Sequence, residues 1–286
     1  ISATPVETAP SPLVMVTVTN NTGGDVYFVA VGKTDVDLVV VRYPDLVPLW
    51  QPDRLDKEAW DSGEVIFPAT GWTPPVPITV KARDGRTELY GLLYRPTAFD
   101  STRSYPIINN VYPGQQVGSV GTRSFVAARG DTRALAELGF IVVQIDAMGT
   151  PLRSKSFHAA SYGDMGDNGL PDQVAGMREL ARRYRWIDST RAGIYGHSGG
   201  GYAAAGAILR YPDFFKVAVS QAGNHDNRSY EDDWGEKWQG LLARRPDGTT
   251  SYDNQANPLL AANLRGHLLL AHGTMDDNVQ IGRAHV

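Results

Sequence analysis

Short apolar runs alternate with helical patterns over residues 105–273, and this alternation constrains the fold more than any other feature of the sequence. The clearest helical pattern covers residues 171–184, where a proline comes early and apolar side chains recur at helical spacing. A second helix is expected near residues 131–138. Short strands separated by helices predict an α/β fold, with a mostly parallel sheet and helices on both faces. The apolar runs are YPIINNVY (105–112), FIVVQIDA (140–147), RAGIYG (191–196), FKVAVSQAG (215–223) and HLLLAHG (267–273).

Residues 1–75 have a different character. They are rich in Val, Thr, Pro and Asp, and short β-prone runs such as VMVTVT and DVYFVAV are separated by turn signals such as NNTGGD. The Pro-rich segment ATGWTPPVP (69–77) follows, and after it residues 78–96 predict a β-hairpin that turns at Asp84 and Gly85. We therefore expect a β-rich unit over residues 1–75 and an α/β domain over residues 76–280.

The composition narrows the possible chemistry. With 286 residues, of which 42% are hydrophobic and 20% charged, the chain can bury a sizeable core. It has no cysteine, which excludes thiol catalysis, disulfides and cysteine-ligated zinc. The net charge of -4 and the lack of a basic run argue against nucleic acid as a partner. No apolar run reaches the roughly 18 residues of a membrane helix, and no P-loop, calcium loop or H-E-x-x-H motif predicts a cofactor or a metal.

The two ends of the chain are unusual. The sequence begins ISATPVETAP without an initiator methionine, and it ends IGRAHV, which reads like a translated sequencing adapter. We predict that residues 281–286 are not native and that the natural sequence continues differently after Gln280.

A nucleophile elbow is the strongest chemical motif. Gly196-His197-Ser198-Gly199-Gly200 fits G-x-S-x-G, in which a serine sits on a tight turn between a strand and a helix. An apolar run precedes the motif and an Ala-rich segment follows it, as that turn requires. Bulk at Gly196 or Gly200 would collide with neighbouring backbone. A merely tight glycine-rich turn is the alternative interpretation, but the context favours Ser198 as a nucleophile.

Such a serine needs a base, a carboxylate that orients the base, and donors for the oxyanion. In α/β-hydrolases the acid follows the serine along the chain, in a loop after a later strand. The segment HGTMDDNV (272–279) offers Asp276 and Asp277 in that place. The residues themselves leave open which of the two is the acid.

Several motifs together resemble the catalytic domain of the prolyl oligopeptidase family of serine peptidases, in its dipeptidyl peptidase IV-like branch. The resemblance implies an α/β-hydrolase fold preceded by a β-propeller. Residues 1–75 would then be the propeller's C-terminal remnant and linker, and residues 76–280 an incomplete peptidase domain. The motifs are VYPG (111–114), DAMG (146–149), WIDSTRAGIYGHSGGGY (186–202) and HGTMDDNV (272–279).

The resemblance also implies roles for individual residues. Ser198 matches the nucleophile, and the first aspartate of the D-D-N loop, Asp276, matches the triad acid. The Tyr112 hydroxyl and the backbone N–H of Gly199 match the oxyanion donors.

The segment GNHDNRSYEDDWGEKWQG (223–240) resembles the part of the family that builds the specificity pocket. Tyr230 and Trp234 match the aromatic walls around a proline-sized side chain, which gains contact area there at little entropic cost. Val279 matches an apolar pocket residue, and Asn278 matches an amide that holds a substrate carbonyl. Trp234 departs from the usual tyrosine, so the preference for Pro over Ala is left open.

None of the six histidines fits the catalytic base. His197 adjoins the serine, but the elbow aims neighbouring side chains apart, so we expect it to pack beneath the turn. His272 ends a strand and is expected to be structural. His285 follows the acid closely, inside the suspected tail. The family's histidine comes well beyond Gln280, so we expect the base outside this chain, the chain alone to be inactive, and a sheet edge and apolar surface to be uncovered.

The sequence thus predicts a serine peptidase that forms an acyl-enzyme at Ser198, as a dipeptidyl peptidase or oligopeptidase with Pro or Ala preference. Two alternatives stay open, namely an esterase or acylaminoacyl peptidase of the same fold, and a non-catalytic binding domain. The expected partner is a peptide substrate, with a homodimer possible in the full-length protein. Family resemblance favours the periplasm or secretion over the cytoplasm.

Overall fold

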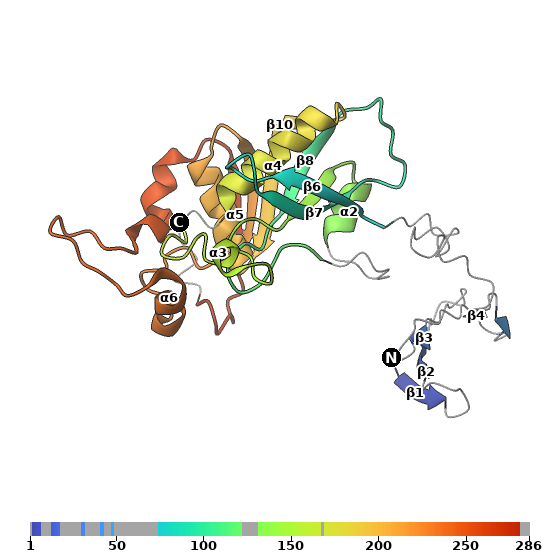
Figure 1. The fold of residues 1–286 in the computed structure, drawn as a ribbon, viewed down its shortest axis with the longest axis horizontal. Coiled ribbons are helices and arrows are strands. Elements are labelled where there is room, and N and C mark those ends of the chain that lie inside the picture. The colour runs from blue at the N-terminus through green and yellow to red at the C-terminus, as the bar shows by residue number, and fades with distance from the viewer. Residues whose placement is uncertain are drawn as a thin grey trace. The chain divides into compact units, whose positions relative to one another are not determined.

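A computed structural model describes residues 74–121, 131–166 and 169–280 in full, and the backbone of short strands within residues 1–73. The chain divides into two compact units, Ile1–Thr73 and Pro74–Val286. Each unit is described by itself below (Figure 1).

The first unit contains short antiparallel strands. Strands β1 (Ser2–Val6), β2 (Leu13–Thr17) and β3 (Ala30–Val31) form one sheet in that order. Strand β4 (Val41–Arg42) pairs with β5 (Val47–Pro48). The other residues of the unit lie outside the described part, so the propeller remnant stays a prediction.

The second unit is built on a seven-stranded mixed sheet in the order β12-β11-β10-β8-β9-β7-β6. Strands β8 to β12 pair in parallel, while β6 and β7 form the predicted antiparallel hairpin at one edge. The strands predicted from the apolar runs are all present, and β10 is longer than its run. The strands are β6 (Val76–Lys81), β7 (Glu88–Tyr94), β8 (Tyr105–Asn110), β9 (Ile141–Ile145), β10 (Ile187–His197), β11 (Phe215–Gln221) and β12 (His267–Ala271).

Both predicted helices are confirmed, as α2 (Asp131–Glu137) and α4 (Leu170–Arg183). Helix α4 begins after Gly169, whose φ of 72° only glycine adopts easily, and Pro171 lies in its first turn. Its apolar side chains are buried against the sheet. The remaining helical segments are α3 (Lys155–His158), α5 (Gly199–Arg210), α6 (Asp232–Gln239) and the 3₁₀ segments η3 (Asp253–Gln255) and η4 (Asn257–Asn263).

Small residues let α5 lie close to the sheet. A Cβ at Gly201 would overlap the carbonyl oxygen of Gln221 on β11. Ala203, Ala204 and Ala207 are fully buried in the same interface. This close packing fixes the start of α5, and therefore Ser198, against the end of the sheet.

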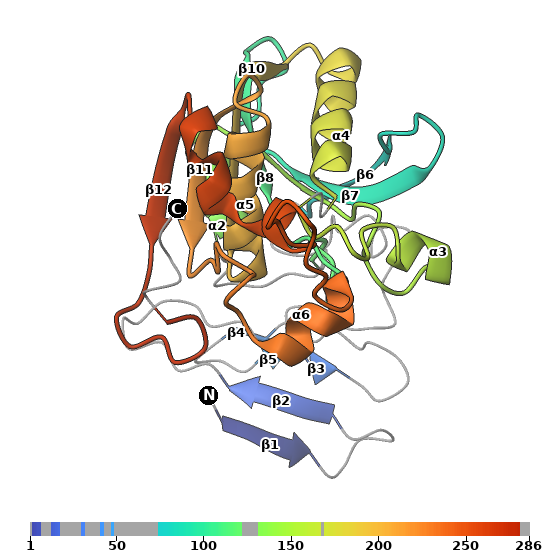
Figure 2. The same cartoon turned by 90° about the vertical axis from the view of Figure 1, so that its left-hand side faces the viewer.

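The sheet has a core on each face. One core packs α4 and α5 against the face of the sheet that is turned toward the viewer in Figure 2. The other core packs α2 against β7 and β9 on the opposite face. On the α2 face the register places Tyr195, Val219 and Leu269 side by side across β10, β11 and β12. Among the described residues α2 is the only helix on this face, and it does not reach β12.

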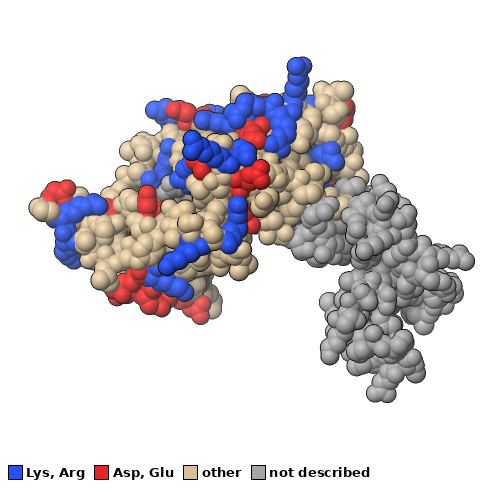
Figure 3. All heavy atoms as spheres, viewed as in Figure 1, with Lys and Arg blue, Asp and Glu red and all other residues tan. Residues whose placement is uncertain are grey.

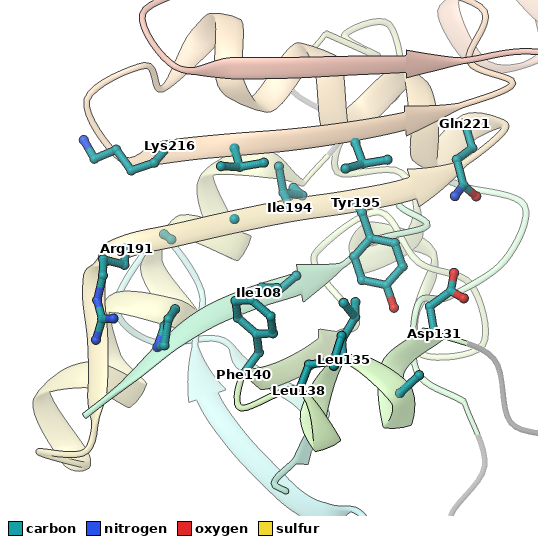
Figure 4. Close-up of a pocket in the computed structure, with 16 residues that line it drawn as sticks. Ile108, Asp131, Leu135, Leu138, Phe140, Arg191, Ile194, Tyr195, Lys216 and Gln221 are labelled. Atoms are coloured by element: carbon teal, nitrogen blue, oxygen red, sulfur yellow. The ribbon is translucent and has the colours of Figure 1, made fainter. Parts of the chain in front are cut away.

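The α2 face is hollowed and apolar beyond α2. Figure 4 shows the hollow, of about 630 Å³, between α2 and strands β8, β10 and β11. Val217 is 45% exposed and Leu269 on the outer strand β12 is 58% exposed. For the described residues, the predicted uncovered edge and apolar surface are therefore present.

Charged side chains of both signs are mixed over the face seen in Figure 3, with acidic groups gathered over α6, where Asp232, Asp233 and Glu236 are exposed. No helix in the part of the chain that the structure describes is both long and apolar enough to cross a bilayer. The same residues contain no cluster of His, Asp and Glu arranged to hold a metal ion.

Candidate active site

Ser198 lies on a strained turn between β10 and α5. Its φ of 56° and ψ of -119° lie in a region that non-glycine residues rarely adopt. Its N–H donates to the carbonyl oxygen of Gln221 at 2.8 Å, which ties the turn to β11. A Cβ at Gly196 or Gly200 would overlap the carbonyl oxygen of Val111, so both glycines are sterically required. These are the features of a nucleophile elbow.

Tyr112 and Gly199 lie together beside the serine. Tyr112 follows β8 and Ser198 follows β10, and these neighbouring strands border the point where the strand order reverses, the usual ligand site of such sheets. A Cβ placed on Gly199 would be 3.6 Å from Cζ of Tyr112 and 3.7 Å from its hydroxyl oxygen. Because Gly199 begins α5, its N–H has no partner within the helix. The structure thus brings both predicted oxyanion donors to one place.

A chain of hydrogen bonds holds the Tyr112 loop. The Tyr112 N–H donates to the Ser119 hydroxyl at 2.9 Å, and the Ser119 N–H donates to the Asp146 carboxylate at 2.7 Å. The Val120 N–H donates to the same carboxylate oxygen at 3.0 Å. Burial raises the pKa of Asp146, against the effect of these two N–H groups, which lower it. The DAMG motif contains Asp146, but no sequence pattern connects this residue with Tyr112.

Asp276 is fixed by the backbone of its own loop. Its carboxylate accepts from the N–H groups of Asn278 at 3.1 Å and Val279 at 2.8 Å. Its other oxygen is 3.5 Å from Nε2 of His272, a nitrogen that also lies 2.6 Å from the Val279 carbonyl oxygen. The Asp276 side chain is 21% exposed, whereas Asp277 is an exposed residue.

A cavity of about 190 Å³ opens beside the elbow. All the predicted site residues except Asp276 line this cavity. The Asp276 carboxylate accepts hydrogen bonds from the backbone of Asn278 and Val279, which both line it. The lining residues among them are Tyr112, Ser198, Gly199, Tyr230, Trp234, Asn278 and Val279.

The aromatic pair forms one wall of this cavity. The rings of Tyr230 and Trp234 meet edge to face with centroids 5.5 Å apart. The Tyr230 hydroxyl donates to Oδ1 of Asn278 at 2.9 Å. With its oxygen engaged in this way, Asn278 has its amide N–H groups left to offer a carbonyl.

Other residues of the cavity wall, including Asn224, Asn227 and Trp238, were not predicted from the sequence. The two asparagines belong to the segment GNHDN (223–227), which begins two residues after β11, at the edge of the sheet where ligands bind. This position after a parallel strand was the signal that could have identified the two asparagines.

The histidines differ in their surroundings. His197 is exposed, so the prediction that it packs beneath the turn is wrong. The space beneath the turn is filled by the contact of Gly196 and Gly200 with the Val111 backbone, and β10 directs His197 outward. His272 is nearly buried and hydrogen-bonded to the loop backbone, which fits the predicted structural role.

Within the described residues no histidine is hydrogen-bonded to Ser198. His225 is buried, with Nε2 3.2 Å from the Ser220 hydroxyl and Nδ1 3.2 Å from the Asn257 amide nitrogen. His285 and the suspected tail, residues 281–286, lie outside the described part of the chain.

The larger hollow on the α2 face is a poor candidate for the chemistry. Its lining is mainly apolar, and its charged groups, Asp131, Arg191 and Lys216, come from three different elements (Figure 4). It contains neither the serine nor the proposed amide and hydroxyl donors.

A mostly parallel sheet whose central strand β10 leads through a strained serine into helix α5 defines the α/β-hydrolase class. The solved structures of two proteins share this fold. A candidate dipeptidyl aminopeptidase IV from Bacteroides ovatus aligns with a TM-score of 0.68 at 27% identity, over 94% of this chain and 36% of that one. Dipeptidyl peptidase 4 of Porphyromonas gingivalis aligns with a TM-score of 0.67 at 22% identity, over 96% of this chain and 39% of that one.

The chain belongs to the prolyl oligopeptidase family, whose family model matches residues 127–285. Human dipeptidyl peptidase 8 is 34% identical over 238 residues, which are 82% of this chain and 26% of that protein. Mouse prolyl endopeptidase FAP is 29% identical over 200 residues, which are 70% of this chain and 26% of that protein. The chain therefore spans about a quarter of the length of these relatives. The resemblance to serine peptidases of the dipeptidyl peptidase type is confirmed.

Proposed function

We propose that this chain carries the nucleophile, the acid and the oxyanion donors of a serine peptidase. The observation that carries the proposal is the convergence on one cavity of Ser198, on its strained turn, with Tyr112 and Gly199. The family's members are serine peptidases, which supports peptides as the substrate class.

In the proposed reaction the Ser198 hydroxyl oxygen attacks the carbonyl carbon of the scissile peptide bond and gives its proton to a general base. The carbonyl oxygen becomes an oxyanion, which accepts hydrogen bonds from the Tyr112 hydroxyl and the Gly199 N–H. Each such donor typically lowers the barrier by about 2.7–4 kcal/mol. The C–N bond then breaks, the amine leaves with the proton, and water hydrolyses the acyl-enzyme ester at Ser198.

Asp276 is proposed to orient the base and to stabilise it once it is protonated. Its carboxylate is held by two backbone N–H groups, so it can keep one direction without rearrangement. Asp277 lacks this support in the described residues and is exposed, which favours Asp276 for the role. We assign the base itself to no residue of the described chain.

The cavity beside Ser198 is proposed to hold the P1 residue, whose carbonyl is attacked. Tyr230, Trp234 and Val279 supply apolar walls, and family resemblance points to Pro or Ala there. The Asn278 amide is proposed to hold a substrate carbonyl. Removal of dipeptides, as the names of several relatives suggest, and dimer formation are further proposals.

Labelling with a fluorophosphonate tests the nucleophile. The experiment uses the full polypeptide that contains this chain, because the chain spans about a quarter of its relatives' length. We expect labelling of the wild type, none of Ser198→Ala, and normal labelling of Ser101→Ala, an exposed serine in the loop after β7.

An unlabelled wild-type polypeptide would contradict the nucleophile assignment and favour a non-catalytic binding domain. Turnover of ester reporters without turnover of peptide amides would instead favour an esterase of the same fold.

A further inference from the structure

Two buried asparagines form part of the cavity wall around Ser198. Asn224 and Asn227 belong to the loop between β11 and α6, and only 7% and 5% of their surfaces are exposed. Both line the cavity together with Ser198 and Tyr230. The roles proposed above use neither of them.

The asparagine pair has unused hydrogen-bonding capacity. Nδ2 of Asn224 donates to Oδ1 of Asn227 at 2.5 Å. Within the described chain, Oδ1 of Asn224 and Nδ2 of Asn227 are buried and have no partner. The pair therefore offers one free acceptor atom and one free donor atom. If the nitrogen and oxygen positions of both amides are exchanged, the pair still offers one free acceptor and one free donor.

The loop that carries the pair is anchored from behind. His225, between the two asparagines, has Nε2 3.2 Å from the Ser220 hydroxyl and Nδ1 3.2 Å from the Asn257 amide nitrogen. The Asn257 N–H also donates to the His225 carbonyl oxygen at 2.8 Å. These bonds hold the backbone between the two asparagines in place, so the position of the pair in the wall is fixed.

A third polar atom lies in the same wall. Nε1 of Trp238, one turn after Trp234 on α6, is buried without a partner in the described residues, and Trp238 lines the cavity. Buried polar atoms without partners cost free energy, and native proteins contain few of them. Of the eleven such side-chain atoms among the described residues, three belong to residues that line this one cavity beside Ser198, and this gathering points to a polar ligand.

We propose that this cavity accepts a P1 side chain with a neutral group that both donates and accepts hydrogen bonds, and that the carboxamide of asparagine fits it best. The inference rests on the proposed function of Ser198. It extends the substrate range beyond the Pro or Ala that family resemblance implies.

The chemistry of the wall selects this group. Proline and alanine side chains can contact the aromatic rings but leave both amide atoms unpaired. A carboxylate can only accept hydrogen bonds. It would accept one from Nδ2 of Asn227, but it would leave Oδ1 of Asn224 without a donor. An ammonium group only donates and leaves Asn227 unpaired. A carboxamide pairs with both asparagines at once.

The test compares Ala-Asn amide with Ala-Leu amide, because the two P1 side chains are nearly equal in size. Calorimetry on the Ser198→Ala form of the full polypeptide measures both affinities without any reaction. We expect the Asn peptide to bind at least about tenfold more tightly, since a site built for hydrogen bonds rejects an analogue that lacks them. Equal or tighter binding of the Leu peptide would overturn the proposal, and this comparison needs no pocket variant.

A double variant assigns the effect to the pair. Asn224→Leu with Asn227→Leu is expected to reduce the Asn-to-Leu preference to about one or below, whereas Asn263→Leu, at an exposed site in η4, should retain it. A preference that survives in a folded double variant would contradict the assignment. Because these measurements use Ser198→Ala, they are independent of fluorophosphonate labelling, so failure of the proposed chemistry and failure of the pocket proposal are distinguishable.

Discussion

At the scale of a single residue, the buried His225 supports the loop that carries Asn224 and Asn227. Burial lowers the pKa of this histidine from its ordinary 6.5 to about 4, with a smaller contribution from the charge of His272. The side chain is therefore neutral at pH 7 and hydrogen-bonded to Ser220 and Asn257. A neutral imidazole in this place supports the asparagine loop without adding a charge beside Ser198.

This depressed pKa predicts a pH dependence of stability. The unfolded chain binds a proton at His225 near pH 6.5, whereas the folded chain does so only near pH 4. The neutral His225 side chain therefore contributes fully to the stability of the folded chain above pH 6.5. This contribution is lost as the pH falls toward 4. At 1.36 kcal/mol for each pKa unit, the loss is about 3 kcal/mol in the free energy of unfolding. Urea unfolding at pH 7.5 and pH 4.5 measures most of this loss, about 2.5 kcal/mol.

The variant His225→Gln separates this effect from the titration of carboxylates. It should be less stable at pH 7.5, but its stability should fall less between the two pH values than that of the wild type. His197→Gln, at an exposed position, should keep the wild-type slope. Equal slopes for wild type and His225→Gln would contradict the account.

At the scale of elements, the loop between β8 and Ser119 decides where the Tyr112 hydroxyl lies. The Ser119 hydroxyl accepts a hydrogen bond from the Tyr112 N–H, and the half-buried Asp146 carboxylate accepts one from the Ser119 N–H. We therefore propose that Ser119 and Asp146 are positioning residues, which would act on the proposed reaction only through Tyr112.

A double-mutant cycle tests this chain of contacts. Tyr112→Phe should lower kcat by about 10²–10³ with little change in KM, the usual loss for one oxyanion donor. Ser119→Ala should lower kcat about tenfold in the wild type and hardly at all in Tyr112→Phe, because coupled residues are not additive. Tyr90→Phe, at an exposed tyrosine on β7, is the matched control. Additive losses would show that Ser119 does not act through Tyr112.

The elements themselves were largely predictable from the sequence. The strands, the Asp84–Gly85 hairpin, α2, α4 and the elbow follow from local patterns, and the structure contains them. The side-chain direction of His197 was not predictable, because it depends on how the glycines pack against Val111. The unpaired state of Asn224 and Asn227 likewise depends on contacts with residues far away in the sequence, and periodicity carries no information about those.

At the scale of the whole molecule, the α2 face of the sheet is the surface on which we expect the chain to self-associate. Apolar side chains of β11 and β12 are exposed there, beside the hollow shown in Figure 4. Parallel sheets are normally covered on both faces, and large exposed apolar surfaces promote association.

We therefore expect this chain, expressed alone, to bind a hydrophobic dye such as ANS and to self-associate in light scattering. Val217→Lys, on the exposed face of β11, should reduce both signals several-fold. Leu152→Lys, at a fully exposed leucine in the loop before α3, should leave both unchanged. A monomeric chain that binds no dye would contradict this prediction.

We propose that Ser198 forms the acyl-enzyme, and trapping that intermediate is the decisive experiment. The full polypeptide is quenched in acid during turnover of an Ala-Pro amide reporter, digested, and analysed by mass spectrometry. We predict that the dipeptidyl acyl group is found on the peptide that contains Ser198, and that Ser198→Ala carries none. Turnover with the acyl group on another residue, or with no covalent intermediate when the amine is released in a burst, would contradict the account.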